Sequence, residues 1–154
     1  MITVRIFSYP TLSKTMRGRI MAGQQEAAKV WTRCRDLHLA ARQAHTPWPD
    51  RDALQQATKG KQFALHSQSI QMVCHAFLAA IESTRQRRRE NPKIRYPYKD
   101  KHFYPLLWPA QAVCVEATRI VLPMGHSHAS IVLPKPDNFP AEPGGVKLIW
   151  NDYH

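Results

Sequence analysis

Positively charged and aromatic side chains alternate in one short stretch of the sequence, Arg95 to Trp108, which reads RYPYKDKHFYPLLW. Cations of this kind bind phosphate groups, because arginine presents a planar fork of N–H donors and lysine a mobile point charge. Aromatic rings stack on unpaired bases, so the combination is typical of surfaces that bind nucleic acid. The chemistry predicted for this stretch is therefore the binding of a polyanion.

The stretch belongs to a longer basic block. From Ser83 to Tyr104 there are eight basic residues against two acidic ones, and eight minus two leaves a charge of +6. The whole chain of 154 residues carries +11, which favours a polyanionic partner over a merely solvated helix end. The residues predicted to contact phosphates are Arg85, Arg87, Arg88, Arg89, Lys93, Arg95, Lys99 and Lys101, with Lys14 and Arg17 upstream.

The rings of the stretch have two possible roles, stacking on bases and packing inside the protein. For Tyr96 and Tyr98, which lie between cations, the sequence favours both roles equally. For Phe103 and Trp108, next to the apolar segment PLLW, core packing is favoured.

Polar residues recur at helical spacing in the segment SQSIQMVCHAF. Ser67, Gln68, Gln71 and His75 lie opposite its apolar residues, and glutamine can bond a base edge as donor and acceptor together. A solvated helix face explains the same pattern. On the pattern alone that second interpretation is favoured.

No catalytic or metal-binding signature is recognisable. His126 and His128 are two residues apart, which is not a common zinc spacing, so we expect a solvent-facing turn. Cys34, Cys74 and Cys114 are widely spaced and odd in number, which predicts three buried thiols rather than disulfides. Gly-rich phosphate loops and nucleophile elbows are also absent from the sequence.

A strand and a long helical zone are predicted at the start of the chain. Apolar residues alternate from Ile2 to Tyr9, which indicates a strand that Pro10 ends. Apolar residues then recur at three- and four-residue steps from Met16 to Ala41, which indicates a helix. Gly18 and Gly23 weaken its first half, so the zone forms either one helix or two shorter ones.

Two further helices are predicted before residue 91. Asp50 is a candidate cap for a short helix that Gly60 stops. The next helix runs from about Ser67 to Glu90, and its basic last turns suit the negative end of the helix dipole. Its apolar stripe consists of Ile70, Val73, Cys74, Phe77 and Ile81.

Short β-branched runs bounded by Pro, Gly or Asn follow residue 91, and each has the length of a strand. They are Ala112–Val115, Arg119–Leu122, Ser130–Leu133 and Val146–Trp150. The tetrapeptide IVLP occurs twice, which we interpret as two neighbouring strands with the same packing need. The order of elements predicts an α+β fold, a small barrel interrupted by a helical insertion.

The order of several segments resembles the N-terminal region of TnpB-type transposon-encoded RNA-guided nucleases and of their type V CRISPR effector relatives. These segments are RIFSYPT, SQSIQMVCHAFLAAIES, IRYPYKDKHFYPLLW, RIVLPMG and KLIWNDYH, and together they extend over almost the whole chain. The most specific parts are Tyr-Pro-Tyr-Lys-Asp-Lys and the Leu-Pro-x-Gly turn at Leu122–Gly125.

The resemblance implies a wedge domain, which is an oligonucleotide-binding-like β-barrel, with a helical recognition lobe inserted after its first strand. Residues 1–10 would be that strand, 11–91 the recognition lobe and 92–154 the rest of the barrel. The partners implied are a guide RNA and double-stranded target DNA. The residues expected to read a short motif flanking the target are Trp48, Ser67, Gln68, Gln71, His75 and Trp108. Trp48 and Trp108 depart from the polar residues that the family has there.

A nuclease lobe would follow the segment KLIWNDYH in such proteins, so the chain is expected to be a fragment or a truncation that binds nucleic acid and cuts nothing. It is expected to need no cofactor, because a divalent metal would belong to the nuclease lobe. The N-terminal segment is expected to be neither a signal peptide nor a membrane anchor, and a cytoplasmic location is expected.

Two other function classes stay open. One is a stand-alone DNA-binding regulator that reads duplex DNA without a guide RNA. The other is a hydrolase whose metal-dependent activity would require His126 and His128.

Overall fold

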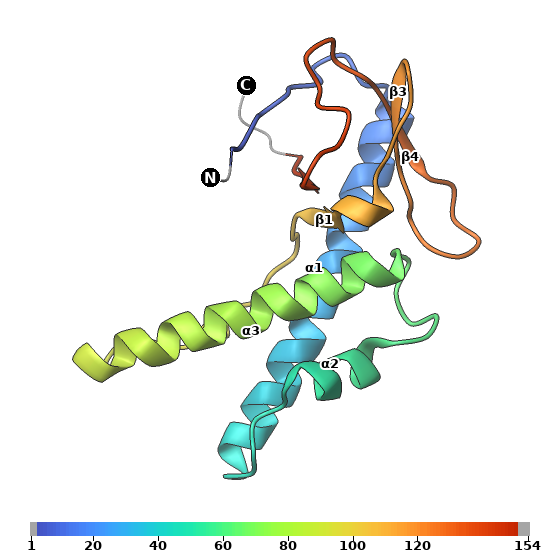
Figure 1. Cartoon of the computed structure of the whole chain (residues 1–154). Coiled ribbons are helices and arrows are strands. Elements are labelled where there is room, and N and C mark those ends of the chain that lie inside the picture. Colours follow the sequence, from blue (N-terminus) through green and yellow to red (C-terminus); the bar gives the residue numbers. More distant parts are fainter. Residues whose placement is uncertain (1–2, 151–154) are drawn as a thin grey trace.

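The computed structural model describes residues 3–150, which form three α-helices and five short strands (Figure 1). The helices lie between Lys14 and Glu90, and the strands lie between Leu106 and Leu148. The chain is therefore an α+β protein, as the sequence predicts. None of the three helices combines the length and the apolar character that crossing a bilayer demands.

Helix α1, Lys14–Gln43, is continuous, so the helical zone is one helix rather than two. Its first turn is capped by Ser13, whose hydroxyl accepts a hydrogen bond from the backbone N–H of Met16 at 3.1 Å. Gly23 does not break it. A Cβ atom at this position would lie 2.9 Å from Leu106 Cδ1, so glycine allows the following sheet to approach the helix closely.

Helices α2, Arg51–Thr58, and α3, Ser67–Glu90, also confirm their predictions. The carboxylate of Asp50 accepts a hydrogen bond from the backbone N–H of Ala53 at 2.9 Å and caps α2. All five residues of the predicted apolar stripe of α3 are buried. The periodic spacing of the apolar residues was sufficient to predict which face of α3 is buried, because burial of one apolar face holds a helix against its neighbours.

The core lies where α1 and α3 cross and continues between these helices and strands β1, β3 and β4, which are described below (Figure 1). The ring of Trp31 packs edge-on against Phe77 with 5.2 Å between their centroids, and the Sγ atoms of Cys34 and Cys74 are 3.7 Å apart. The hydrogen bond with Cys74 and burial both raise the pKa of the Cys34 thiol. Cys114 is exposed on a two-residue edge strand, so the prediction of a buried thiol is wrong at this position.

The strands form two small antiparallel sheets. Strands β2 (Cys114–Val115), β3 (Arg119–Leu122) and β4 (Ile131–Pro134) are adjacent in this order, and β1 (Leu106–Pro109) pairs with β5 (Gly145–Leu148). The two IVLP copies lie in β3 and β4, where Leu122 is opposite Ile131. They are neighbouring strands, as predicted.

The described residues form no closed barrel, and the predicted first strand is wrong for residues 3–9, which have no regular secondary structure. This segment is held by side chains instead. The hydroxyl of Tyr9 donates to the carbonyl oxygen of Pro134 at 2.8 Å, and the rings of Phe7 and Phe139 lie 5.4 Å apart. Val4 and Ile6 are exposed, so their alternation has no sheet to bury it.

Candidate nucleic-acid interface

The end of α3 and the linker to β1, residues 91–105, carry the basic block. We call this surface the basic face and define it by Arg85, Arg87, Arg88, Arg89, Lys93, Arg95, Lys99 and Lys101. Among the residues that the structure describes, five of these side chains are exposed and form no ion pair: Arg87, Arg89, Lys93, Arg95 and Lys99. Their charge is therefore available to a ligand.

The other three cations of the basic face are held by neighbouring groups. Arg85 Nε lies 3.0 Å from a carboxylate oxygen of Glu82, and this hydrogen bond lowers the pKa of Glu82. Arg88 donates a hydrogen bond to the carbonyl oxygen of Ile94 in the linker. Lys101 Nζ lies 4.9 Å from the centre of the Trp31 ring. These contacts fix the orientation of the three side chains on the basic face.

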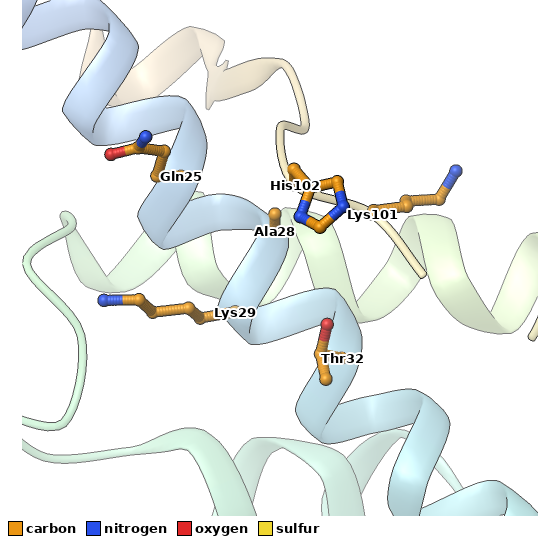
Figure 2. A pocket seen from close by; sticks show the side chains of 6 residues that line it. All are labelled: Gln25, Ala28, Lys29, Thr32, Lys101 and His102. Atoms are coloured by element: carbon orange, nitrogen blue, oxygen red, sulfur yellow. The ribbon is translucent and has the colours of Figure 1, made fainter. Parts of the chain in front are cut away.

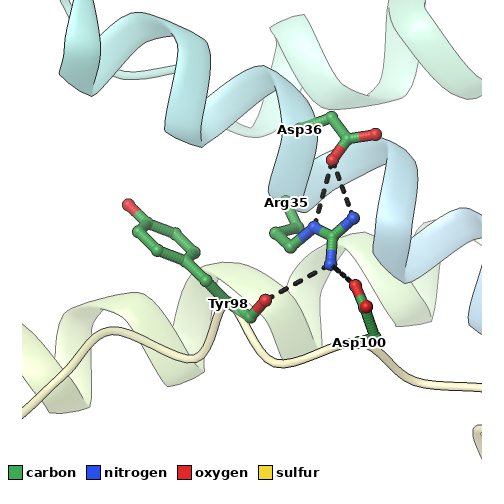
Figure 3. Close-up of polar contacts among 4 residues, drawn as sticks. All are labelled: Arg35, Asp36, Tyr98 and Asp100. Carbon is green, nitrogen blue, oxygen red and sulfur yellow. Dashed lines mark hydrogen bonds and ion pairs between the residues drawn. The ribbon is translucent and has the colours of Figure 1, made fainter.

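Arg35 of α1 anchors the linker against the helix (Figure 3). Its guanidinium donates to the backbone oxygen of Tyr98 at 3.3 Å, pairs with Asp36 at 3.0 Å and pairs also with Asp100. The Arg35 guanidinium lowers the pKa of the Asp100 carboxyl. Asp36 and Asp100 are thereby neutralised, and Glu90, at the end of α3, forms no ion pair among the described residues. The exposed cations of the basic face still outnumber this one free carboxylate.

Four aromatic side chains form a cluster beside the basic face, and we call His38, Trp48, Tyr96 and Tyr98 the aromatic cluster. The ring centroids of His38 and Trp48 are 4.6 Å apart, and those of Trp48 and Tyr96 are 5.6 Å apart at an interplanar angle of 86°. Tyr98 Oη lies 2.6 Å from His38 Nδ1. Tyr96 and Tyr98 are half-buried in these contacts, so packing accounts for both rings.

Sequence reasoning missed three residues of this region, Arg35, His38 and Arg42. They recur at steps of three and four residues, so they share one face of α1. The guanidinium carbon of Arg42 lies 4.5 Å from the centre of the Tyr96 ring. Their spacing was the available signal, but a search for apolar stripes passes over charged residues.

His38 should make the stability of the fold depend on pH. Its side chain is 1% exposed, and burial together with the charge of Arg42 lowers its pKa below the ordinary value of 6.5. The unfolded chain then binds a proton that the folded chain rejects, so stability is full above pH 6.5 and falls as pH drops below it. Urea unfolding at pH 7.5 and 5.5 should show this loss.

The variant His38→Phe should reduce that loss, because the replaced ring has no proton to gain. His66 and His75 also have lowered pKa values, through burial, and keep a residual pH dependence of the same sign. An equal loss of stability in the wild type and in His38→Phe would contradict the assignment to His38.

A shallow depression of about 390 Å³ lies between α1 and the linker (Figure 2). It is lined by Gln25, Ala28, Lys29, Thr32, Lys101 and His102. The side chains of Lys29 and Lys101 extend away from each other in Figure 2, so their ammonium groups do not converge on the depression.

Phe103 follows His102, which lines this depression. Phe103 is 47% exposed, so the prediction that it packs in the core is wrong. Tyr104 takes the inner position instead. Its ring centroid lies 5.0 Å from that of Trp31, and its backbone N–H donates to the carbonyl oxygen of Gln24. Phe103 therefore presents its ring to solvent.

Four of the six residues expected to read a flanking motif lie in the first turns of α3, whereas Trp48 and Trp108 lie elsewhere. Ser67 and Gln71 are exposed and Gln68 is half-buried at the start of α3. His75 Nε2 lies 3.5 Å from the side-chain nitrogen of Gln55 in α2. Trp48 belongs to the aromatic cluster, where it packs against His38 and Tyr96.

The structure does not support the prediction that Trp108 reads a flanking motif. Its side chain is 0% exposed in the core, and its Nε1–H donates to the carbonyl oxygen of Pro123 at 2.7 Å. A base cannot reach it in this conformation, whereas the prediction of core packing is confirmed. Lys14 and Arg17 are exposed in the first turns of α1, apart from the basic face (Figure 1).

No group of three or more potential metal ligands is present among residues 3–150. His126 and His128 lie exposed in the turn between β3 and β4, as the sequence predicts. Comparisons with protein-family models, with curated proteins and with solved structures find no match to this chain.

Proposed function

We propose that this chain binds nucleic acid and is the N-terminal, non-cutting part of an RNA-guided DNA endonuclease. In this proposal it binds the scaffold of a guide RNA and supports the guide–target heteroduplex in the cytoplasm. It also contacts the target DNA beside the heteroduplex. The cutting chemistry and its divalent metal are assigned to a nuclease lobe of the same polypeptide.

The observation that carries the proposal is the set of five exposed cations without ion pairs at the end of α3 and in the linker. Neutralising a phosphate with such a cation releases condensed counterions from the nucleic acid, and this release drives binding without regard to sequence. Recognition of an A-form duplex depends on its phosphates and its shape, which a basic surface of this kind suits.

Two exposed groups suit the rest of the proposed role. Phe103 presents a ring beside the basic face, where a base can stack on it. Ser67 and Gln71 present short polar side chains at the start of α3, where they can bond base edges of the flanking motif.

Purification from cells tests the proposal against the alternative of a guide-independent regulator. We expect the chain, after nuclease-free purification, to carry a defined small RNA that sequencing identifies. Its affinity for that RNA should exceed its affinity for duplex DNA. The absence of a defined RNA together with tight, sequence-specific binding to duplex DNA would instead indicate the regulator.

A further inference from the structure

Tyr96 joins two arginines that come from different helices. The guanidinium carbon of Arg42, in the last turn of α1, lies 4.5 Å from the centre of the Tyr96 ring. The guanidinium carbon of Arg88, in the last turn of α3, lies 5.0 Å from the same point. The ring thus brings together two positive charges that are 46 positions apart in the sequence.

The two arginines have unmatched charge. No carboxylate within the described range 3–150 forms an ion pair with Arg42 or Arg88. Asp36 and Asp100 pair with Arg35, and Glu82 pairs with Arg85. Glu90, two positions after Arg88, is exposed and forms no ion pair among the described residues, with Arg88 or with any other cation. Both arginines are half-buried, so solvent screens their mutual repulsion incompletely.

Stacking on a ring leaves the hydrogen-bonding groups of an arginine accessible. A guanidinium stacks through its flat face, whereas its five N–H donors point outward in its own plane. Arg88 donates to the carbonyl oxygen of Ile94, and its remaining donors are not used by this contact. The two guanidinium carbons lie 4.5 Å and 5.0 Å from one ring centre, so they are at most 9.5 Å apart.

We propose that Arg42 and Arg88 form a clamp for one backbone phosphate of the bound nucleic acid, and that Tyr96 is the positioning residue of this clamp. The inference rests on the proposed function and deepens it. It assigns Arg42, which lies outside the basic block, to the interface. It also gives Tyr96 a role in orienting cations rather than in stacking on a base.

Binding to two ligands tests the clamp: an A-form RNA duplex, and inorganic polyphosphate, which has phosphates and no bases. Arg42→Ala should weaken binding of both by about tenfold, the loss typical of one charge-assisted hydrogen-bonding group. Tyr96→Leu should weaken both similarly, and Tyr96→Phe should bind both as the wild type does. Arg119→Ala is the charge-matched control: it lowers the net charge by the same single unit at β3, where Arg119 pairs with Glu116, and should change affinity only slightly.

The outcomes separate the clamp from the proposed function. If the wild type binds RNA and the Arg42→Ala and Arg119→Ala variants bind it with equal affinity, the clamp is overturned and the proposed function still stands. A Tyr96→Leu variant that loses affinity for RNA but not for polyphosphate would show base stacking and also overturn the clamp. A wild-type chain that does not bind RNA would overturn both. If Tyr96→Leu fails to fold, the comparison of Arg42→Ala with Arg119→Ala decides.

Discussion

Replacing Arg87, Arg88 and Arg89 together with alanine is expected to flatten the salt dependence of RNA binding by about 2 to 3 units in the slope of log affinity against log salt concentration. Each phosphate contact contributes about 0.7 to 0.9 units to that slope, and the three residues occupy the last turn of α3 on the basic face. Near 0.1 M salt the same change corresponds to a loss of roughly 100- to 1,000-fold in affinity. Fluorescence anisotropy with labelled RNA at several salt concentrations measures both quantities.

A charge-matched control distinguishes the position of the cations from their number. The triple variant Arg119→Ala, Lys135→Ala and Lys147→Ala removes the same charge from the strand region. It should leave most of the slope intact. A slope that the Arg87–Arg89 variant does not change would exclude this part of the basic face as a phosphate-binding surface.

Trp108→Ala is expected to destabilise the protein by about 3–5 kcal/mol. The indole is the largest fully buried side chain among residues 3–150, and its removal leaves both a cavity and an unpaired carbonyl oxygen at Pro123. A domain of this size is stable by about 5–15 kcal/mol, so the variant should lose much of its total stability. Chemical denaturation followed by circular dichroism measures the change.

Trp48 provides the comparison for this prediction. It is 39% exposed, so Trp48→Ala should cost clearly less stability than Trp108→Ala. Trp108→Phe should lie between Trp108→Ala and the wild type, because it keeps a ring but loses the hydrogen bond to Pro123. A Trp108→Ala variant with unchanged stability and altered preference for a flanking motif would contradict the structural role and restore the motif-reading role.

Local patterns in the sequence were sufficient to predict the positions of the three helices. The bounds of α3 follow from its apolar stripe and from the proline after Asn91, and the start of α2 follows from the cap at Asp50. These features act within a few residues of the chain. The two IVLP strands were also predictable, because both carry the same short β-branched run.

Pairing between distant segments could not be predicted in this way. Residues 3–9 alternate like a strand, but a strand requires a partner with free N–H and C=O groups, and none is paired with this segment among the described residues. The positions of Phe103 and Tyr104 in the linker depend equally on a distant contact. Only one of these two neighbouring rings, that of Tyr104, packs against Trp31, and the sequence does not show which one does.

The basic face was predictable from composition, whereas its organisation was not. The eight cations are visible in the sequence, but the ion pair of Arg35 with Asp100 and the contact of Arg42 with Tyr96 join segments that are far apart in the chain. Charged residues on α1 look like a solvated helix face until the linker is placed against them. The functional role of each cation therefore required the three-dimensional structure.

The central claim, that the end of α3 and the linker bind nucleic acid, is tested most directly by photo-crosslinking the chain to a structured RNA and identifying the crosslinked peptides by mass spectrometry. The account predicts crosslinks within residues 85–103 and their loss in the Arg87–Arg89 alanine variant. Crosslinks confined to residues 114–135, or none at RNA concentrations that saturate binding, would contradict it.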